Sequence, residues 1–319
     1  MVSQVQSPEP VTGIQFGFSV ATDGNLAAVG APMSQLAALN GGAIFLYQNA
    51  GNGWQRLDTT FSSATPGDML GCAVAVRGSV LSAGACGGLG AVQVYEDIAG
   101  QWQLVTTLAP LEVEASDLFG SVVAVGDGVI AVGAPGTNNF AGAVHLFEKQ
   151  PEGNWIPVAV LTAADGQPND LFGRVVSADG TTLAVGAERH DSEGGENAGA
   201  VYIYERAGGT WGVESAKLTA SDGKGFDEFG HSVALSGSEL VVGARWTDAR
   251  SVDAGTAYLF ELRGESWIEA ARLNAPDAAA GDGLGFAVAV DQETVISTAY
   301  PDLPGGNNSG SVYVFERAQ

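Results

Sequence analysis

Short runs in which apolar and polar residues alternate recur along the whole chain. In one copy the run "FGSVVAVG" begins at Phe119 and is followed, after the turn "DG", by "VIAVGAP". The runs "GAVHLFE" from Gly142 and "NWIPVAVLTA" from Asn154 complete this copy. A period of two with valine, isoleucine and aromatic residues predicts β-strands, and the glycine-containing turns predict hairpins. Each copy is therefore expected to form four strands, named a to d, and no segment predicts a long helix.

This four-strand pattern occurs six times. A step such as Phe-Gly ends at Gly17, Gly71, Gly120, Gly173, Gly230 and Gly285, and successive steps are 49 to 57 residues apart. The slot "GAP", or a variant of it, follows each step, and a tryptophan predicted for the core comes later at Trp54, Trp102, Trp155, Trp211 and Trp267. Four strands in a period of this length are typical of the blades of a β-propeller.

The chain is thus predicted to be all-β, a six-bladed β-propeller of four-stranded antiparallel blades that forms a single domain, residues 1–319. The repeats are expected at approximately 11–64, 65–113, 114–166, 167–223, 224–278, and 279–319 plus 1–10. The last repeat lacks a strand d, and "QVQSPEPVTGIQFG" aligns without gaps to "KLTASDGKGFDEFG". Residues 1 to about 8 are therefore expected to close the ring by pairing in the C-terminal blade, which would leave no open sheet edge.

The recurring pattern "FGxSVAV…GAPG…GAVxVF…W" resembles the FG-GAP repeat, which occurs in integrin α-subunit propellers and in bacterial extracellular proteins. The resemblance covers all six copies. It implies an extracellular or cell-surface adhesion protein that binds its ligand on the face formed by the variable b–c loops and d–a links. The resemblance also raises the question of calcium, which integrin propellers bind in hairpins of the form D-x-D-x-D-G-x-x-D.

The a–b turns do not carry that calcium motif. They read "TDGN", "RGS", "GDG", "ADGT", "SGS" and "DQE", with at most two carboxylates each, whereas calcium takes six to eight oxygen ligands. No cofactor is therefore required by the pattern, and calcium is possible only elsewhere.

A second acidic pattern recurs in the d–a links. Acids stand three residues before the step glycine, at Asp68, Asp117, Asp170, Asp227 and Asp282, and eight before it, at Glu9, Glu112, Asp165, Asp222 and Asp277. One hypothesis is calcium binding by Asp117, Asp165, Asp170, Asp222, Asp227, Asp277 and Asp282 with backbone carbonyls. The alternative is that these carboxylates accept backbone N–H bonds and shape the turns.

The charge balance limits the classes of partner. The chain has 36 acidic and 13 basic residues, a net charge of −23, so nucleic acid and anionic membrane surfaces are expected to be repelled. The same charge also serves solubility. No apolar run has the length for membrane insertion, the start "MVSQVQSPEP" does not read as a secretion signal, and a monomer is expected.

Two cysteines, Cys72 and Cys86, lie on neighbouring strands of one predicted hairpin. In a regular register their side chains point to opposite faces, which predicts two buried thiols. A disulfide between them would require a bulge or a shifted turn.

One group of residues departs from the repeat pattern. Trp246 lies in a b–c loop beside Arg245 and Arg250, and the preceding blade offers Arg189 and His190. Tyr300, in the degraded "GAP" slot of the last copy, is added to these candidate ligand-binding residues. Aromatic and arginine side chains suit stacking on a sugar or gripping a carboxylate. The alternative is that the tryptophan folds back on the blade and the arginines pair with Asp248, Asp253 or Glu188.

No catalytic motif is present. The three histidines, His145, His190 and His231, come from different blades without a nucleophile beside them. The leading functional prediction is a non-catalytic recognition or adhesion module, lectin-like, that binds a glycan or a protein. Alternatives are a glycoside hydrolase or lyase using channel carboxylates, and a structural adhesion unit of a larger secreted protein.

Overall fold

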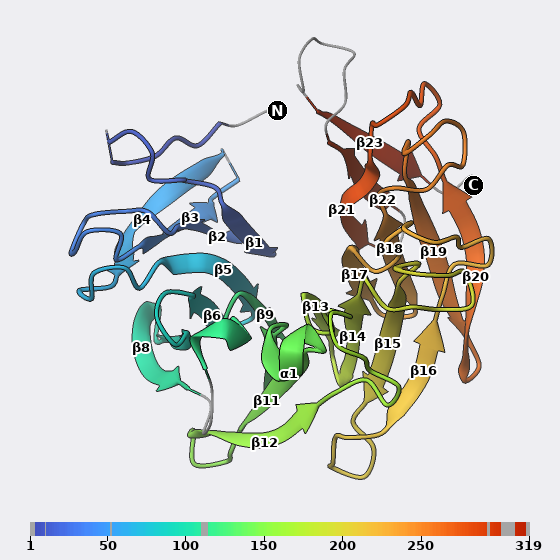
Figure 1. Cartoon of the computed structure of the whole chain (residues 1–319). Coiled ribbons are helices and arrows are strands. Elements are labelled where there is room, and N and C mark those ends of the chain that lie inside the picture. The colour runs from blue at the N-terminus through green and yellow to red at the C-terminus, as the bar shows by residue number, and fades with distance from the viewer. Residues whose placement is uncertain are drawn as a thin grey trace. The chain divides into compact units, whose positions relative to one another are not determined.

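A computed structural model describes residues 4–9, 11–51, 53–109, 114–291, 294–300 and 310–316 of the chain. Apart from two short helical turns, η1 (Ala115–Asp117) and α1 (Thr137–Phe140), the regular structure in these residues is β-strand (Figure 1). The strands form six antiparallel sheets, each in chain order, so the chain is all-β and six-bladed as the repeats predict. None of the helices in these residues has the length and apolarity of a membrane span.

The described residues group into two compact units, which are treated separately below. Unit 1 contains residues 1–137 and 145–158, and unit 2 contains residues 138–144 and 159–319. That the chain forms a single domain stays a prediction.

Unit 1 holds the first three blades, apart from segment 138–144 and the end of the third blade's last strand. The first blade is β1 (Ser19–Asp23), β2 (Leu26–Ala31), β3 (Ala43–Asn49) and β4 (Trp54–Ser62). The second is β5 (Leu70–Arg77), β6 (Val80–Ala85), β7 (Ala91–Ile98) and β8 (Gln101–Leu108). The third is β9 (Val122–Val125), β10 (Val129–Ala134), β11 (Ala143–Lys149) and β12 (Trp155–Leu161).

Unit 2 holds the last three blades, drawn from yellow-green to red in Figure 1. The fourth blade is β13 (Val175–Asp179), β14 (Thr182–Ala187), β15 (Ala200–Glu205) and β16 (Glu214–Leu218). The fifth is β17 (Ser232–Ser236), β18 (Glu239–Ala244), β19 (Thr256–Arg263) and β20 (Ser266–Leu273). The sixth is β21 (Leu284–Asp291), β22 (Thr294–Ala299) and β23 (Ser311–Glu316).

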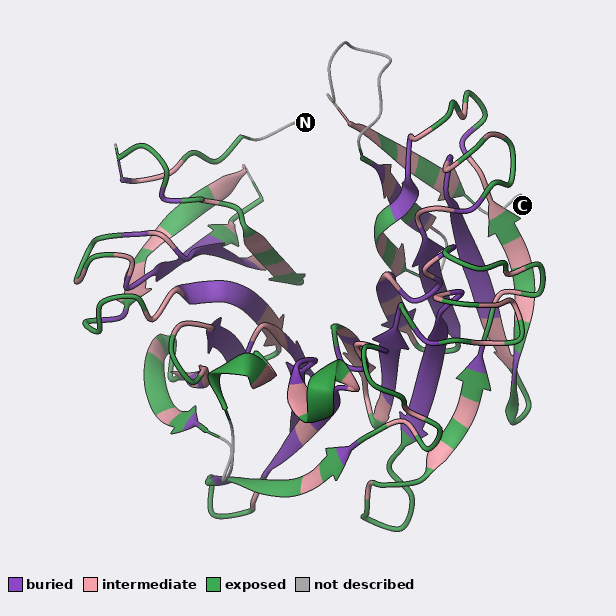
Figure 2. Cartoon of the chain, viewed as in Figure 1, coloured by how far each residue is buried: buried purple, intermediate pink, exposed green. Residues whose placement is uncertain are grey.

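The core lies between the faces of neighbouring blades. Figure 2 shows that strands b and c are largely buried, whereas strands d alternate between buried and exposed residues. In unit 2 the buried Phe229 ring packs edge-on against Tyr258 and Phe260, with centroids 5.4 and 5.9 Å away. Of the repeat tryptophans, Trp155 and Trp267 are buried and the other three are half-buried. Within each unit, neighbouring sheets therefore bury apolar faces against each other.

Close backbone approach between blades explains the "GAP" glycine. A Cβ on Gly243, at the end of strand b of the fifth blade, would overlap the carbonyl oxygen of Gly285, the step glycine of the sixth. Ser232 Oγ donates a hydrogen bond of 2.8 Å to the same oxygen. The two glycines therefore set how closely these blades pack.

The sixth sheet has three strands in the described part of the chain, and residues 4–9 lie in no strand. One contact of the N-terminal segment nevertheless matches that of an internal d–a link. Tyr47 donates a hydrogen bond to the Gln6 carbonyl, and the equivalent Tyr204 donates one to the Thr162 carbonyl. Residues 1–3 lie outside the described residues. Pairing of residues 1 to about 8 in the last blade stays a prediction.

Candidate functional site

Two positions meet where strand a begins and strand b ends: the residue after the step glycine and the third residue of the "GAP" slot. In the second blade they are Cys72 and Cys86, which form a disulfide. In the fourth blade they are Arg174 and Glu188, and Arg174 Nε lies 2.9 Å from Glu188 Oε1. The same structural position thus carries a covalent link in one blade and an ion pair in another.

The prediction of two separate thiols is wrong because β5 contains a bulge. The register runs from Leu70 opposite Ala85 to Ala73 opposite Gly84, so two residues are inserted between these pairs. The bulge turns Cys72 toward Cys86, as a disulfide between these strands requires.

Glu188 is the centre of a charged cluster in unit 2. It is 2% exposed, and its Oε2 lies 2.5 Å from Nδ1 of His231 on the next blade. Burial by itself raises the pKa of Glu188. The hydrogen bond and charge of His231 and the charges of Arg174 and Arg245 outweigh burial and hold the pKa of Glu188 below its ordinary value.

Arg245 connects this cluster to an aromatic side chain. Its guanidinium lies 2.8 Å from Oε2 of Glu228 and 4.9 Å from the centroid of the Trp246 ring. Trp246 is half-buried, and its backbone N–H donates to the carbonyl of Asp227 at 3.4 Å. The tryptophan is therefore partly folded back on the blade, while Arg245 is shared between a carboxylate and a ring.

Aromatic rings continue the cluster onto the sixth blade. The ring centroid of Phe286 lies 5.4 Å from that of His231 and 5.3 Å from that of Tyr300. Phe286 is 38% exposed and Tyr300 is 50% exposed. We name the whole set the arginine–aromatic site, made of Arg174, Glu188, Glu228, His231, Arg245, Trp246, Phe286 and Tyr300.

The remaining candidate ligand residues differ in accessibility. Arg189 and Arg250 are exposed, and within the described residues neither guanidinium makes an ion pair. His190 is buried, with Nδ1 2.8 Å from Asp170 and Nε2 2.8 Å from Nζ of Lys217. Trp246, Arg245 and Tyr300 thus belong to one connected site, whereas His190 is enclosed beneath a d–a link.

The aspartates three residues before the step glycine close turns. Oδ2 of Asp170 accepts the N–H of Gln167 at 2.9 Å, and Asp117, Asp227 and Asp282 accept the N–H three residues earlier in the same way. The carbonyl of Asp170 also accepts the N–H of Arg189, the residue after the "GAP" slot. These acids therefore join the d–a link to the end of strand b, as the turn-shaping alternative expects.

Three of the acids eight residues before the step glycine accept a tyrosine hydroxyl from strand c of the blade that follows, whereas Glu9 accepts the hydroxyl of Ser34. Asp165 binds Tyr202 at 2.8 Å, and the equivalent pairs are Asp222 with Tyr258 and Asp277 with Tyr313. A basic residue on strand d adds a charge, namely Lys217 at Asp165 and Arg272 at Asp222. We call this arrangement the link lock. Glu112 lies outside the described residues.

The link lock perturbs both of its members. Burial by itself raises the pKa of Asp165. Hydrogen bonds from Lys217 and Tyr202 and the nearby positive charges have a larger, opposite effect, so the pKa of Asp165 lies below its ordinary value. Burial, with Asp165 beside the hydroxyl, raises the pKa of Tyr202. The phenol therefore stays protonated and the carboxylate charged, which is the combination the hydrogen bond needs.

The carboxylates of the a–b turns and of the Glu188 cluster already have partners, which does not fit an integrin-type calcium site. In the a–b turns, Asp23 and Asp179 each accept an N–H from the following blade's turn, and Asp127 pairs with Arg77 at 2.7 Å. Side-chain ligand atoms of Glu188, Glu228 and His231 lie within 4.8 Å of one another, but both carboxylates already bind arginine. A calcium ion would have to displace these cations, and its preferred ligands are oxygens.

Sequence reasoning missed five members of the arginine–aromatic site as binding candidates: Arg174, Glu188, Glu228, His231 and Phe286. Three of them, Arg174, Glu188 and His231, had a signal in the repeat. At the position after the step glycine, Arg174 and His231 stand where the other blades have phenylalanine, cysteine or serine. At the third "GAP" position, Glu188 and Arg245 stand where the other blades have proline or cysteine. Ionisable residues at these two positions distinguish the fourth and fifth blades.

Sheets of this kind, repeated with the same a-to-d order, define a repeat protein of β-propeller blades. The model of the family described as FG-GAP repeat matches five segments, residues 8–47, 102–147, 155–204, 212–260 and 267–315. These segments make up well over half of the chain, so the chain belongs to the FG-GAP repeat family. The unmatched stretch 48–101 includes β5 to β7 of the second blade. A search of curated proteins found no match.

Proposed function

We propose that the protein is a non-catalytic recognition module, at the cell surface or outside the cell, that binds a glycan or protein ligand bearing a carboxylate. The ligand-binding surface is the arginine–aromatic site of unit 2, together with the exposed Arg189 and Arg250. Membership of the FG-GAP family supports an adhesion role, because such repeats are typical of extracellular proteins.

The observation that carries the proposal is the row of partly exposed rings beside arginines. Phe286 and Tyr300 leave 38% and 50% of their surface exposed and pack on each other, and the half-buried Trp246 packs on Arg245 in the same cluster. Aromatic faces stack on the apolar faces of sugar rings, and guanidinium groups bind carboxylates through two parallel hydrogen bonds. On a chain of charge −23, the exposed Arg189 and Arg250 would also attract an acidic group to this surface.

The carboxylates of the site favour binding over catalysis. The pKa of Glu188 lies below its ordinary value, so this carboxylate is ionised at neutral pH, and Glu228 is bound by Arg245. Glycoside hydrolysis needs a carboxyl group that is protonated near neutral pH to protonate the leaving oxygen. Glu188 does not meet this requirement, and Glu228 is engaged by Arg245, so we propose that the site holds its ligand without cleaving it and needs no metal.

A glycan array that includes uronic-acid and sialic-acid glycans, probed with the wild-type protein and with Trp246→Ala, tests the proposal. We expect wild-type binding to at least one acidic glycan, weakened at least about tenfold in the variant, because central aromatic contacts dominate binding energy. Mass spectrometry of the same glycans after incubation is expected to show them intact.

Phe18→Ala is the matched control for Phe286→Ala, because Phe18 occupies the same position in the first blade and is 61% exposed. Phe286→Ala is expected to weaken binding and Phe18→Ala to leave it unchanged. Equal binding by wild type and Trp246→Ala, or cleavage of the glycans, would contradict the proposal. If acidic protein ligands bind and glycans do not, the partner is a protein.

A further inference from the structure

The second blade lacks every part of the link lock. Ser63 stands where the fourth blade has Asp165, and Gln93 stands where it has Tyr202. The strand d partner of Gln93 is Thr107, whereas the partner of Tyr202 is Lys217. Gly88 replaces His190 at the fourth residue from the "GAP" glycine. Four large polar side chains are thus replaced by smaller ones around one d–a link.

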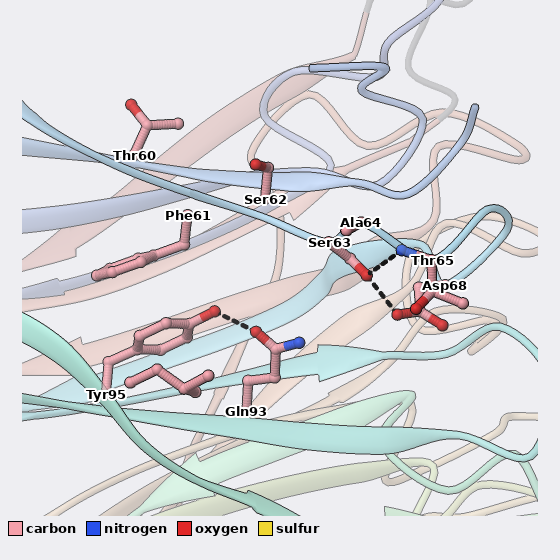
Figure 3. Close-up of a pocket in the computed structure, with 10 residues that line it drawn as sticks. Thr60, Phe61, Ser62, Ser63, Ala64, Thr65, Asp68, Gln93 and Tyr95 are labelled. Atoms are coloured by element: carbon pink, nitrogen blue, oxygen red, sulfur yellow. Dashed lines mark hydrogen bonds between the residues drawn. The ribbon is translucent and has the colours of Figure 1, made fainter. Parts of the chain in front are cut away.

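A pocket occupies the space that these replacements leave. It has a volume of about 450 Å³ and lies between the link into the second blade, the end of β4, and strands β7 and β8 (Figure 3). This volume is in the range of small-molecule sites. Its lining residues are Thr60, Phe61, Ser62, Ser63, Ala64, Thr65, Asp68, Gln93, Tyr95 and Leu104. All of them belong to unit 1, so the pocket is separate from the arginine–aromatic site.

The polar groups of the pocket are already oriented. The Tyr95 hydroxyl donates to the amide oxygen of Gln93, which leaves the amide nitrogen on the opposite side as a donor (Figure 3). The hydroxyl of Ser63 donates to Oδ2 of Asp68 and accepts the N–H of Thr65 at 3.1 Å. An amide donor, a carboxylate acceptor and several hydroxyl groups thus line one small space, and neighbouring groups fix Gln93, Ser63 and Asp68.

One wall of the pocket is apolar. The rings of Phe61 and Tyr95 stack with their centroids 3.8 Å apart, and Phe61 is half-buried while Tyr95 is buried. Leu104 on β8 is 52% exposed. Apolar surface beside hydroxyl, amide and carboxylate groups suits a pyranose ring, which has an apolar face and a rim of hydroxyls.

The charge of the lining selects among sugars. Asp68 is its one charged residue, and no lysine or arginine belongs to the lining. A carboxylate without a nearby cation accepts hydrogen bonds from hydroxyls and repels anions. We propose that the pocket is a second binding site, specific for a neutral saccharide. It does not depend on the function proposed for unit 2.

Saturation-transfer NMR tests this site with neutral hexoses, N-acetylhexosamines and their disaccharides, alongside glucuronic and galacturonic acid. We expect at least one neutral sugar to give transfer signals with the wild-type protein and the uronic acids to give weaker ones. The decisive variant is Ser63→Asp/Gln93→Tyr/Thr107→Lys, which rebuilds the link lock on the template of the fourth blade. It is expected to fold with an unchanged or higher melting midpoint and to lose sugar binding.

Gln93→Ala keeps the rest of the pocket and removes its amide, so we expect affinity to fall at least about tenfold, as for a lost buried hydrogen-bonding partner. Trp246→Ala, in unit 2, is the control and is expected to bind these neutral sugars as the wild type does. The proposal is overturned if no neutral sugar binds, if binding persists in the folded triple variant, or if uronic acids bind as well as neutral sugars.

Discussion

Glu188 illustrates how one buried side chain joins two blades. Arg174 approaches it within its own blade at 2.9 Å and His231 from the next blade at 2.5 Å. A buried carboxylate is costly unless it is paired and hydrogen-bonded, and here both conditions are met. The residue therefore fixes the position of His231, on whose ring Phe286 of the arginine–aromatic site packs.

Replacing Glu188 by glutamine is expected to flatten the acid limb of the stability curve. Because the folded pKa of Glu188 lies below its ordinary value of 4.5, its contribution is fully present above pH 4.5 and is lost as pH falls through the folded pKa. At neutral pH we expect Glu188→Gln to lower the free energy of unfolding by about 2 kcal/mol, through loss of charged hydrogen bonds.

Urea unfolding measured between about pH 7 and pH 3 checks this, with Glu265→Gln as the control at an exposed glutamate. The control is expected to follow the wild-type curve. If the free energy of unfolding of Glu188→Gln falls with pH as steeply as that of the wild type, the pH dependence comes from other carboxylates. Asp165 and Glu269 also have lowered pKa values.

At the scale of the element, backbone contact between sheets determines how strands a and b are built. Gly142, Gly199 and Gly255, at the start of strand c, each bridge to the step of the following blade. The "GAP" glycine then lies against the next step glycine, where no side chain fits. The repeated glycines are thus a consequence of sheet-to-sheet distance, and not only of turn geometry.

Gly243→Ala is expected to lower the free energy of unfolding by about 3 kcal/mol, in the range for overpacking a rigid contact. Its Cβ would overlap the Gly285 carbonyl and Ser232 Oγ. Gly237→Ala is the control, because that glycine has φ +57° in an a–b turn with open space around its Cβ. It is expected to cost about 1 kcal/mol, from backbone strain alone. Equal losses in the two variants would show that close approach at Gly243 is not the limiting contact.

At the scale of the whole molecule, the sequence shows a strong excess of acid, −23, but the link carboxylates are largely bonded to N–H, hydroxyl or basic groups. An acidic chain of this kind could depend on calcium, or it could neutralise its acids internally. The bonding of Asp165 and Asp222 by tyrosine and by lysine or arginine favours internal neutralisation.

We therefore expect the melting midpoint to be the same with EDTA and with added calcium. Asp170→Asn is the informative variant, because Asp170 accepts Gln167 N–H and binds His190. It is expected to lower the midpoint equally in both buffers, as measured by differential scanning calorimetry. A calcium-induced rise in the wild type that disappears in Asp170→Asn would establish a metal site in the link.

The alternation of apolar residues and the repeat period were sufficient to predict the strands and the six blades. These signals are local, since a strand and its hairpin lie within a short stretch of chain. Trp246, Arg245 and Tyr300 were recognisable for the same reason, as departures from a repeated pattern.

The pairings of side chains were decided only by the tertiary structure. Cys72 meets Cys86 because a bulge shifts the register, and Glu188 meets His231, 43 residues away, because two blades pack face to face. The pocket beside Gln93 likewise exists because several positions distant in sequence carry smaller side chains in the second blade than in the fourth. Local periodicity specifies which residues form a sheet, whereas bulges and sheet packing specify which side chains come into contact.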